Sequence, residues 1–200
     1  MRRPVKRLSL VIAVFAVAAV AAALLLPGQQ AARDLDLFSN DLCLVAPATP
    51  YDPASGLAML APRPIPADAR CPVCGMYPAR FSRWAAQSIF KDGAAHYFDS
   101  PLDLFVFLQD IDRYDRRYTG DVAISFVTDL ESGQLIEAGN AFFVHGSTAF
   151  GPMRDADLPA FASRAAADDF IRSRNGRVLT FSQITSELIQ SMNRNVPHRH

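Results

Sequence analysis

The stretch WAAQSIFKDGAAHYFDSPLDLFVFLQDI, residues 84–111, contains three consecutive signals of regular structure. Its beginning, WAAQSIF, is predicted to be a strand, KDG is typical of a hairpin turn, and AAHYFDS is the expected partner strand. Ser100 followed by Pro101 is typical of the N-cap and first residue of a helix, so the apolar run that follows is predicted to be helical. The stretch therefore predicts a strand–strand–helix unit.

The rest of the folded region repeats this order of elements. The expected elements are strands at 122–130, 141–147 and 177–184, a tight element at 148–153, and helices at 158–176 and 182–195. No residue-level repeat accompanies the order strand–strand–helix–strand, so the inference of a duplication rests on the element order alone. The sequence predicts an α+β fold with two small ββαβ-type units.

The N-terminal segment, residues 1–30, combines a basic leader with a long apolar run. Four basic residues precede Leu8–Leu26, which contains 19 uncharged residues. A helix of that length rises about 30 Å, enough to cross the hydrocarbon core of a bilayer. The positive leader places the N-terminus in the cytoplasm and the rest of the chain outside. We expect an uncleaved single-span transmembrane anchor, with removal of the segment as a signal peptide as the alternative.

The next segment, residues 31–67, is rich in proline and is predicted to be an extended arm, because proline removes backbone hydrogen-bond donors. A short strand is expected within it at Gly56–Leu60. The folded domain is then expected to occupy residues 68–200, with 68–130 and 138–186 as its two candidate subunits.

The charge distribution argues against a nucleic-acid partner. Beyond residue 30 the chain has 16 basic and 20 acidic residues, a net charge of −4. No basic patch with interleaved aromatic residues occurs there, and nucleic-acid binding depends on such a patch.

The stretch CPVCGMYPAR, residues 71–80, contains two of the three cysteines. Its Cys-x-x-Cys-Gly spacing is that of half a zinc knuckle, but a structural zinc site needs four ligands, and no second half follows. A thiol–disulfide oxidoreductase has this motif at a helix start after a strand, whereas here a proline-rich segment precedes it and Pro78 follows. A zinc-knuckle interaction protein and an oxidoreductase using Cys71 and Cys74 are the alternatives.

Met76 favours a different metal. Thiolate and thioether sulfur are soft donors, and soft donors select Cu(I). Cys74-Gly75-Met76 places one donor of each kind within a single turn. Because two or three ligands suffice for Cu(I), whereas zinc requires four, the methionine favours copper.

Other donors are weaker candidates. Met153 follows a proline after a strand and is expected on a turn, although methionine is commonly core filler. His145 and His96 lie on predicted strands among aromatic residues, where a hydrogen-bonded structural histidine is the common case. The remaining candidates are Met59, His198 and His200.

From about residue 70 to residue 184 the sequence resembles the NosL family, the copper-binding accessory proteins of nitrous oxide reductase assembly. The resemblance rests on the motifs CPVCGM, HYFDSPLDLFVFL, FVHGS and GPM and on the segment AADDFIRSRNGRVLTFSQI. It implies a fold made of a pair of small α+β units, which agrees with the repeated element order.

The resemblance also implies a set of Cu(I) ligands. Cys74 and Met76 match the family's Cys-Gly-Met, Cys71 matches its first cysteine, and Met153 matches its later Pro-Met. One of the two strand histidines is the candidate nitrogen donor, and His145 is retained in the expected ligand set.

The function that the resemblance implies is that of a periplasmic Cu(I)-binding chaperone. It would deliver copper for the copper centres of nitrous oxide reductase, with that reductase and its membrane maturation transporter complex as partners, and it would not be an enzyme. Family members are typically lipoproteins of the bacterial periplasm, whereas this sequence has an apparent membrane span. We therefore expect a single-pass protein of the bacterial inner membrane with its soluble domain in the periplasm.

Overall fold

The structure, a computed structural model, describes residues 46–117 and 119–194 of the chain. Among these residues no helix combines the length and the apolar character that crossing a bilayer requires. The expected span Leu8–Leu26 lies outside the described residues, as do Cys43 and the terminal histidines.

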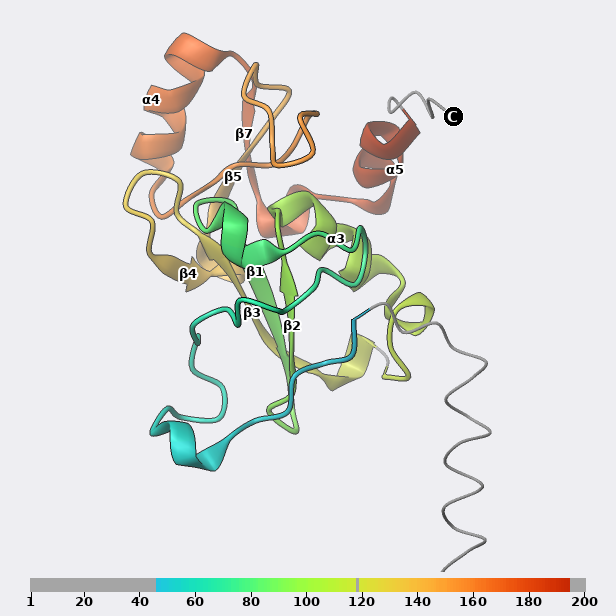
Figure 1. Cartoon of the computed structure of the whole chain (residues 1–200). Coiled ribbons are helices and arrows are strands. Elements are labelled where there is room, and N and C mark those ends of the chain that lie inside the picture. The colour runs from blue at the N-terminus through green and yellow to red at the C-terminus, as the bar shows by residue number, and fades with distance from the viewer. Residues whose placement is uncertain (1–45, 118, 195–200) are drawn as a thin grey trace, which may run out of the picture. The chain divides into compact units, whose positions relative to one another are not determined.

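The first sheet has four antiparallel strands (Figure 1). They are β1 (Ala86–Phe90), β2 (Ala95–Phe98), β3 (Val122–Thr128) and β4 (Leu135–Glu137), in the order β2-β1-β3-β4. Helix α3 (Pro101–Gln109) connects β2 to the later strands. Ser88 of β1 faces His96 of β2 on one side and Ser125 of β3 on the other.

The second sheet has three antiparallel strands and its own helix. The strands are β5 (Phe142–His145), β6 (Ala160–Phe161) and β7 (Arg177–Thr180), in the order β6-β5-β7, and α4 is Arg164–Arg174. Figure 1 shows α4 beside β5 and β7. In both sheets the first strand is central, flanked by the second strand and by the strand that follows the helix. The predicted α+β class is confirmed.

Helix α3 begins where the sequence predicts it. The Ser100 hydroxyl accepts a hydrogen bond from the Asp103 N–H at 3.2 Å, and Pro101 occupies the first turn. Two side chains of this helix, Leu104 and Phe107, are fully buried. The helix therefore has a fixed start directly after β2, and this fixed start positions the site described below.

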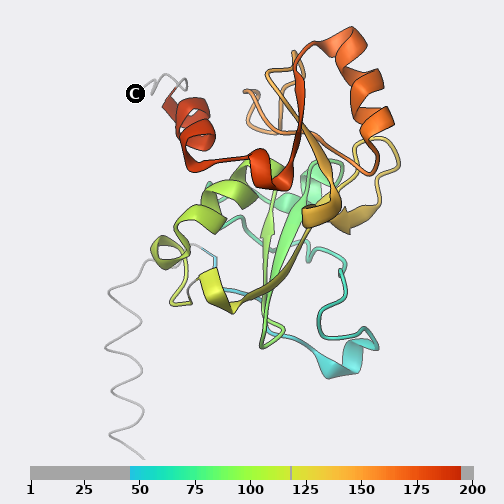
Figure 2. The same ribbon diagram turned by 180° about the vertical axis from the view of Figure 1, so that it is seen from behind.

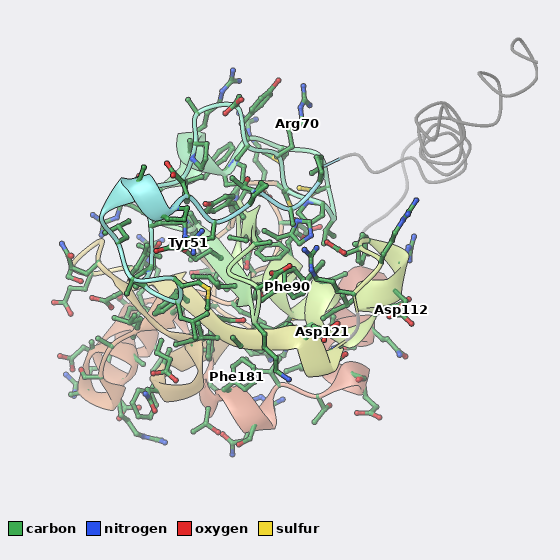
Figure 3. All side chains as sticks on the ribbon, turned by 90° about the horizontal axis from the view of Figure 1, so that it is seen from below. Tyr51, Arg70, Phe90, Asp112, Asp121 and Phe181 are labelled. Atoms are coloured by element: carbon green, nitrogen blue, oxygen red, sulfur yellow. The ribbon has the colours of Figure 1, made fainter. Side chains whose placement is uncertain are left out.

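One hydrophobic core is shared by both sheets. The Phe105 ring of α3 packs against Phe143 of β5 at 5.1 Å and against Phe181 at 5.0 Å between ring centroids. The last helix, α5 (Ser186–Arg194), packs on α3 and buries Ile189 (Figure 2). Figure 3 shows Arg70 near the edge of the molecule and Phe90, which is fully buried, near its centre.

Short 3₁₀ helices complete the described secondary structure. They lie at Pro53–Ser55, Pro78–Phe81, Ile111–Arg113, Thr119–Asp121, Ala138–Asn140 and Phe181–Gln183.

Two of the predicted elements are wrong. Gly56–Leu60 is not a strand: the Ala61 N–H bonds the Ala58 carbonyl in a turn. The helix expected at 158–176 begins only at Arg164, because Ser163 caps it and the residues before the cap pair as β6. The second strand of the second sheet is therefore β6, not the tight element at 148–153.

The described part of the proline-rich arm contacts the first sheet. Thr49 exchanges two backbone hydrogen bonds of 2.8 Å with Ala95 of β2. The Arg63 N–H donates to the side-chain oxygen of Gln87 at 3.1 Å. The arm thus lacks long regular elements but is attached to the domain by specific hydrogen bonds.

The division of the domain into subunits 68–130 and 138–186 stays a prediction.

Candidate metal centre

The loop that carries the two cysteines is a tight turn. The Gly75 N–H bonds the Cys71 carbonyl, and the Cys71 N–H bonds the Met76 carbonyl, both at 2.9 Å. Gly75 has a φ of +75°, a left-handed conformation that glycine adopts without steric cost. The Arg70 guanidinium donates to the Gly75 carbonyl at 3.1 Å. The backbone of this turn therefore holds Cys71 and Cys74 side by side.

Two aspartates from the junction of β2 and α3 face these cysteines. The Cys71 thiol donates to Oδ2 of Asp103 at 3.3 Å, and the Cys74 thiol donates to Oδ1 of Asp99 at 3.0 Å. One ligand atom from each of the four residues lies within 4.8 Å of every other. Asp99 directly follows β2, and Asp103 lies in the first turn of α3, so the capped helix start described above sets both positions. We call these four residues the cysteine–aspartate site.

The site is mostly enclosed. Cys71 and Asp99 are fully buried and Asp103 is buried, whereas Cys74 is half-buried. Of the four residues, Cys74 is therefore the one that is partly exposed to solvent. Oδ2 of Asp99 is buried and accepts no hydrogen bond from a thiol, hydroxyl or N–H group of the described residues, while the neighbouring carboxyl group of Asp103 can share a hydrogen bond with Asp99 when it is protonated. Because buried polar atoms are nearly always paired, this oxygen is available to a cation, and two thiols and two carboxylates are suitable metal donors.

Burial and the neighbouring charges favour the protonated forms of Cys71, Cys74 and Asp103. Burial, together with the neighbouring thiol and carboxylates, raises the pKa of Cys71 far above its usual range. A hydrogen bond with Cys71 lowers the pKa of Cys74, but burial and the Asp103 carboxylate outweigh it and raise the pKa. Burial also raises the pKa of Asp103 to about 6. A dithiol oxidoreductase needs a lowered thiol pKa, so these shifts disfavour that alternative.

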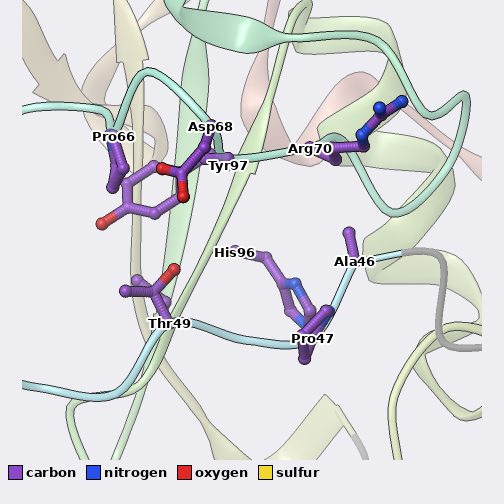
Figure 4. Close-up of a pocket in the computed structure, with 10 residues that line it drawn as sticks. Ala46, Pro47, Thr49, Pro66, Asp68, Arg70, His96 and Tyr97 are labelled. Atoms are coloured by element: carbon purple, nitrogen blue, oxygen red, sulfur yellow. The ribbon is translucent and has the colours of Figure 1, made fainter.

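His96 does not lie among the four donors. Its ring is buried, and Nε2 lies 2.7 Å from Oδ2 of Asp115. Figure 4 shows His96 beside Pro47, Thr49 and Tyr97 at a separate cavity of about 330 Å³ between the arm and β2. No cysteine or methionine lines this cavity. His96 is thus the hydrogen-bonded structural histidine that its strand position suggested.

His145 also lies outside the four-donor group. It is at the end of β5 opposite Arg177 of β7 and is half-buried. Partial burial and the Arg177 charge lower the pKa of His145. A role for His145 as a nitrogen ligand stays a prediction.

The two methionines of the expected ligand set have different surroundings. Met76 closes the cysteine turn through its carbonyl and is half-buried. Met153 is 58% exposed on the loop between β5 and β6, so it is not core filler.

Sequence reasoning missed Asp99 and Asp103. Both flank the N-cap Ser100 in the stretch FDSPLD, where carboxylates are explained by helix capping and the helix dipole alone. Only the packing of the cysteine turn against this junction shows that they face the thiols.

Comparisons with known proteins point to one family. The family model described as NosL matches residues 62–189, which is well over half of the chain. The copper-binding lipoprotein NosL of Stutzerimonas stutzeri is 31% identical over 122 residues, which cover 60% of this chain. The match spans 64% of that relative, slightly less than two thirds of its length.

Two solved structures are similar. The crystal structure of the copper chaperone NosL from Shewanella denitrificans matches with a TM-score of 0.54 and 24% identity, covering 64% of this chain and 97% of that one. The solution structure of the apo-NosL protein from Achromobacter cycloclastes matches with a TM-score of 0.41 and 23% identity, over 52% of this chain and 87% of that one. The first of these likenesses shows that the fold is shared.

Proposed function

The chain belongs to the NosL family, and we propose that it is a Cu(I)-binding chaperone whose metal site is the cysteine–aspartate site. The observation that supports this most strongly is the convergence of four donors around a buried carboxylate oxygen, Oδ2 of Asp99, that lacks a hydrogen-bond partner in the described structure. A buried carboxylate oxygen that no donor bonds is costly when Asp103 is ionised, and a bound cation would then supply the missing partner.

The choice of copper rests on the sulfur donors. Cys71 and Cys74 lie together, and Met76 belongs to the same turn, so up to three soft donors are available. Soft thiolate and thioether ligands select Cu(I). Two thiols and two carboxylates also match the ligand number of zinc, so zinc is the competing metal in the test below.

The role of a carrier is supported by the unequal burial of the two thiols. Cys71 is fully buried, whereas Cys74 is half-buried and faces the outside of the site. The thiol protons must leave when a metal binds, and each thiol already donates a hydrogen bond to a carboxylate. We propose that copper enters and leaves on the Cys74 side, with Met153 as the exposed donor there. No turnover is proposed for this protein.

The location and partners are proposed from the N-terminal sequence and the family. Leu8–Leu26 would anchor the protein as a single-pass protein of the bacterial inner membrane, with the described domain in the periplasm. Nitrous oxide reductase and its membrane maturation transporter complex would be the acceptors of copper.

The test is metal competition on the full-length protein, reduced and kept anaerobic in detergent. Cu(I) affinity is measured against a chromophoric Cu(I) chelator, and retained Cu(I) and Zn(II) are quantified after joint exposure. Cys74→Ser should lose most Cu(I) binding, while Cys43→Ser is the matched cysteine control and should keep it. Stoichiometric zinc that Cu(I) does not displace would instead support a structural zinc site.

A further inference from the structure

The loop that carries Met153 has an ordered, strained tip. Phe150 pairs with Ala156 across the loop, and the Gly151 N–H bonds the Asp155 carbonyl at 2.9 Å. Arg154 has a φ of +60°, a left-handed conformation that is unfavourable for this residue. Phe150 and Met153 are nevertheless 66% and 58% exposed. The hydrogen bonds of the loop thus hold an apolar tip in solvent.

The base of this loop is attached to the helix start that carries the metal site. Oδ1 of Asp157 accepts hydrogen bonds from the Leu158 N–H at 2.7 Å and from the Leu102 N–H of α3 at 3.1 Å. Leu102 directly precedes Asp103, whose Oδ2 accepts the Cys71 thiol at 3.3 Å. A continuous path of bonds therefore joins the Met153 loop to the buried cysteine.

Gly151 makes the contact between the loop and Asp157 very close. A Cβ atom at Gly151 would lie 2.2 Å from Oδ2 and 2.7 Å from Cβ of Asp157. Only glycine fits there, because any side chain would push the loop away from the carboxyl group. The tip thus rests directly on Asp157.

We infer that Asp157 is a positioning residue, which fixes the Met153 loop against the first turn of α3 so that the thioether is held beside the cysteine–aspartate site. The inference rests on the proposed function, in which Met153 binds copper. Asp157 is buried, so its accepting oxygen is held in place by the packing around it. Oδ1 of Asp157 accepts the N–H groups of Leu158 and of Leu102 in α3, and Asp157 also hydrogen-bonds the side chain of the N-cap Ser100, so these contacts rather than a charge partner fix its position.

The test compares Cu(I) affinities of variants of the full-length protein by chelator competition, with thermal melting as the control for folding. Asp157→Ala removes the acceptor for the Leu102 N–H and the hydrogen bond to the Ser100 side chain, whereas Gly151→Ala displaces the loop without changing Asp157. Each should weaken Cu(I) binding by about as much as Met153→Ala, in the range of about 10- to 100-fold found for outer-shell partners of metal ligands. Asp157→Asn keeps the accepting oxygen and should retain an affinity close to that of the wild type.

A double variant shows whether Asp157 acts by positioning Met153 or by stabilising the protein in general, because losses of Cu(I) affinity from the same cause do not add. Asp157→Ala combined with Met153→Ala should bind no more weakly than Met153→Ala alone, because both remove the same thioether. Asp129→Ala is the matched control: Asp129 is equally buried and accepts backbone hydrogen bonds from Ser132 and Ala162, outside the site. It should lower the melting temperature and leave Cu(I) affinity unchanged.

Three results overturn the inference. The first is that Asp157→Ala and Gly151→Ala both bind Cu(I) as tightly as the wild type while Met153→Ala binds more weakly, and the second is a full additional loss of affinity in the double variant. If Met153→Ala alone binds as tightly as the wild type, the premise about Met153 is wrong and the inference falls with it. In each of these cases the Cys74→Ser measurement still decides the proposed function independently.

Discussion

The Cys74 thiol donates a hydrogen bond to Oδ1 of Asp99 at 3.0 Å, and Oδ2 of the same carboxylate has no partner within the described structure. Asp99 follows β2 directly, whereas Cys74 lies in a turn 25 residues earlier. The sequence resemblance implies the sulfur donors, and this contact brings a carboxylate oxygen from a different part of the chain to Cys74. The proposed metal site is therefore a mixed sulfur and oxygen site.

Asp99→Asn tests the oxygen donor. The amide keeps an oxygen that can accept the Cys74 thiol but removes the negative charge that a cation would pair with. We expect Cu(I) affinity to fall by about 10- to 100-fold, the range for a supporting metal partner. Because the wild-type carboxylate is buried and incompletely paired, the melting temperature of the apo protein should not fall. Unchanged affinity with a lower melting temperature would show that Asp99 is structural.

Met76→Ala and Met153→Ala test the thioether donors. Met153 is largely exposed, so its removal should change the free energy of unfolding by no more than about 0.5 kcal/mol. Met76 is half-buried, and its removal should cost less than the roughly 2–5 kcal/mol of a core methionine. Both variants should weaken Cu(I) binding in chelator competition. A marked drop in melting temperature with unchanged copper affinity in Met76→Ala would make that residue packing and remove the main argument for copper over zinc.

The pH dependence of apo-protein stability tests the burial of Asp157. Burial raises its pKa to about 7, although hydrogen bonds from Leu158 and Leu102 oppose the shift. A raised carboxyl pKa means that the folded state binds a proton that the unfolded state does not, so this stabilisation is full below about pH 4 and is lost as the pH rises through about 7. Denaturant titrations at pH 5 and pH 8 should therefore show a smaller pH dependence in Asp157→Asn than in the wild type. An identical pH dependence in both proteins would contradict the burial of an ionisable group there.

The reactivity of the cysteine pair tests the alternative that the protein is a thiol–disulfide oxidoreductase. Burial raises the pKa of Cys71, and the net pKa of Cys74 is raised as well, so neither thiol is a good nucleophile at neutral pH. The reduced protein should react slowly with iodoacetamide at pH 7 and should show negligible insulin reduction. Rates close to those of a thioredoxin would move the assignment to an oxidoreductase.

The sequence predicted the parts of the fold that depend on local signals. Ser100 and Pro101 start a helix in the structure as their types indicate, and the KDG turn joins two paired strands. The second sheet was predicted less well, because β6 contains only Ala160 and Phe161 and is defined by its pairing with β5. A strand that short has no periodicity for sequence reasoning to detect.

The residues of the site divide in the same way, into those that a local motif indicates and those that only the fold brings together. Cys71, Cys74 and Met76 belong to one short motif and could be found from their spacing and donor chemistry. Asp99 and Asp103 become visible only when the turn and the β2–α3 junction are brought together by the fold. His145 was selected as a strand histidine in a family motif, but it lies outside the group of four donors.

The most direct test of the central claim is the Cu(I) content and affinity of the full-length, reduced protein compared with Cys74→Ser. We predict one tightly held Cu(I) per chain that Zn(II) does not displace, and loss of most of this binding in Cys74→Ser with an unchanged melting temperature of the apo protein. Equal Cu(I) affinity in the wild type and in Cys74→Ser, or retained zinc that Cu(I) cannot replace, would contradict the assignment of the cysteine–aspartate site as a copper site.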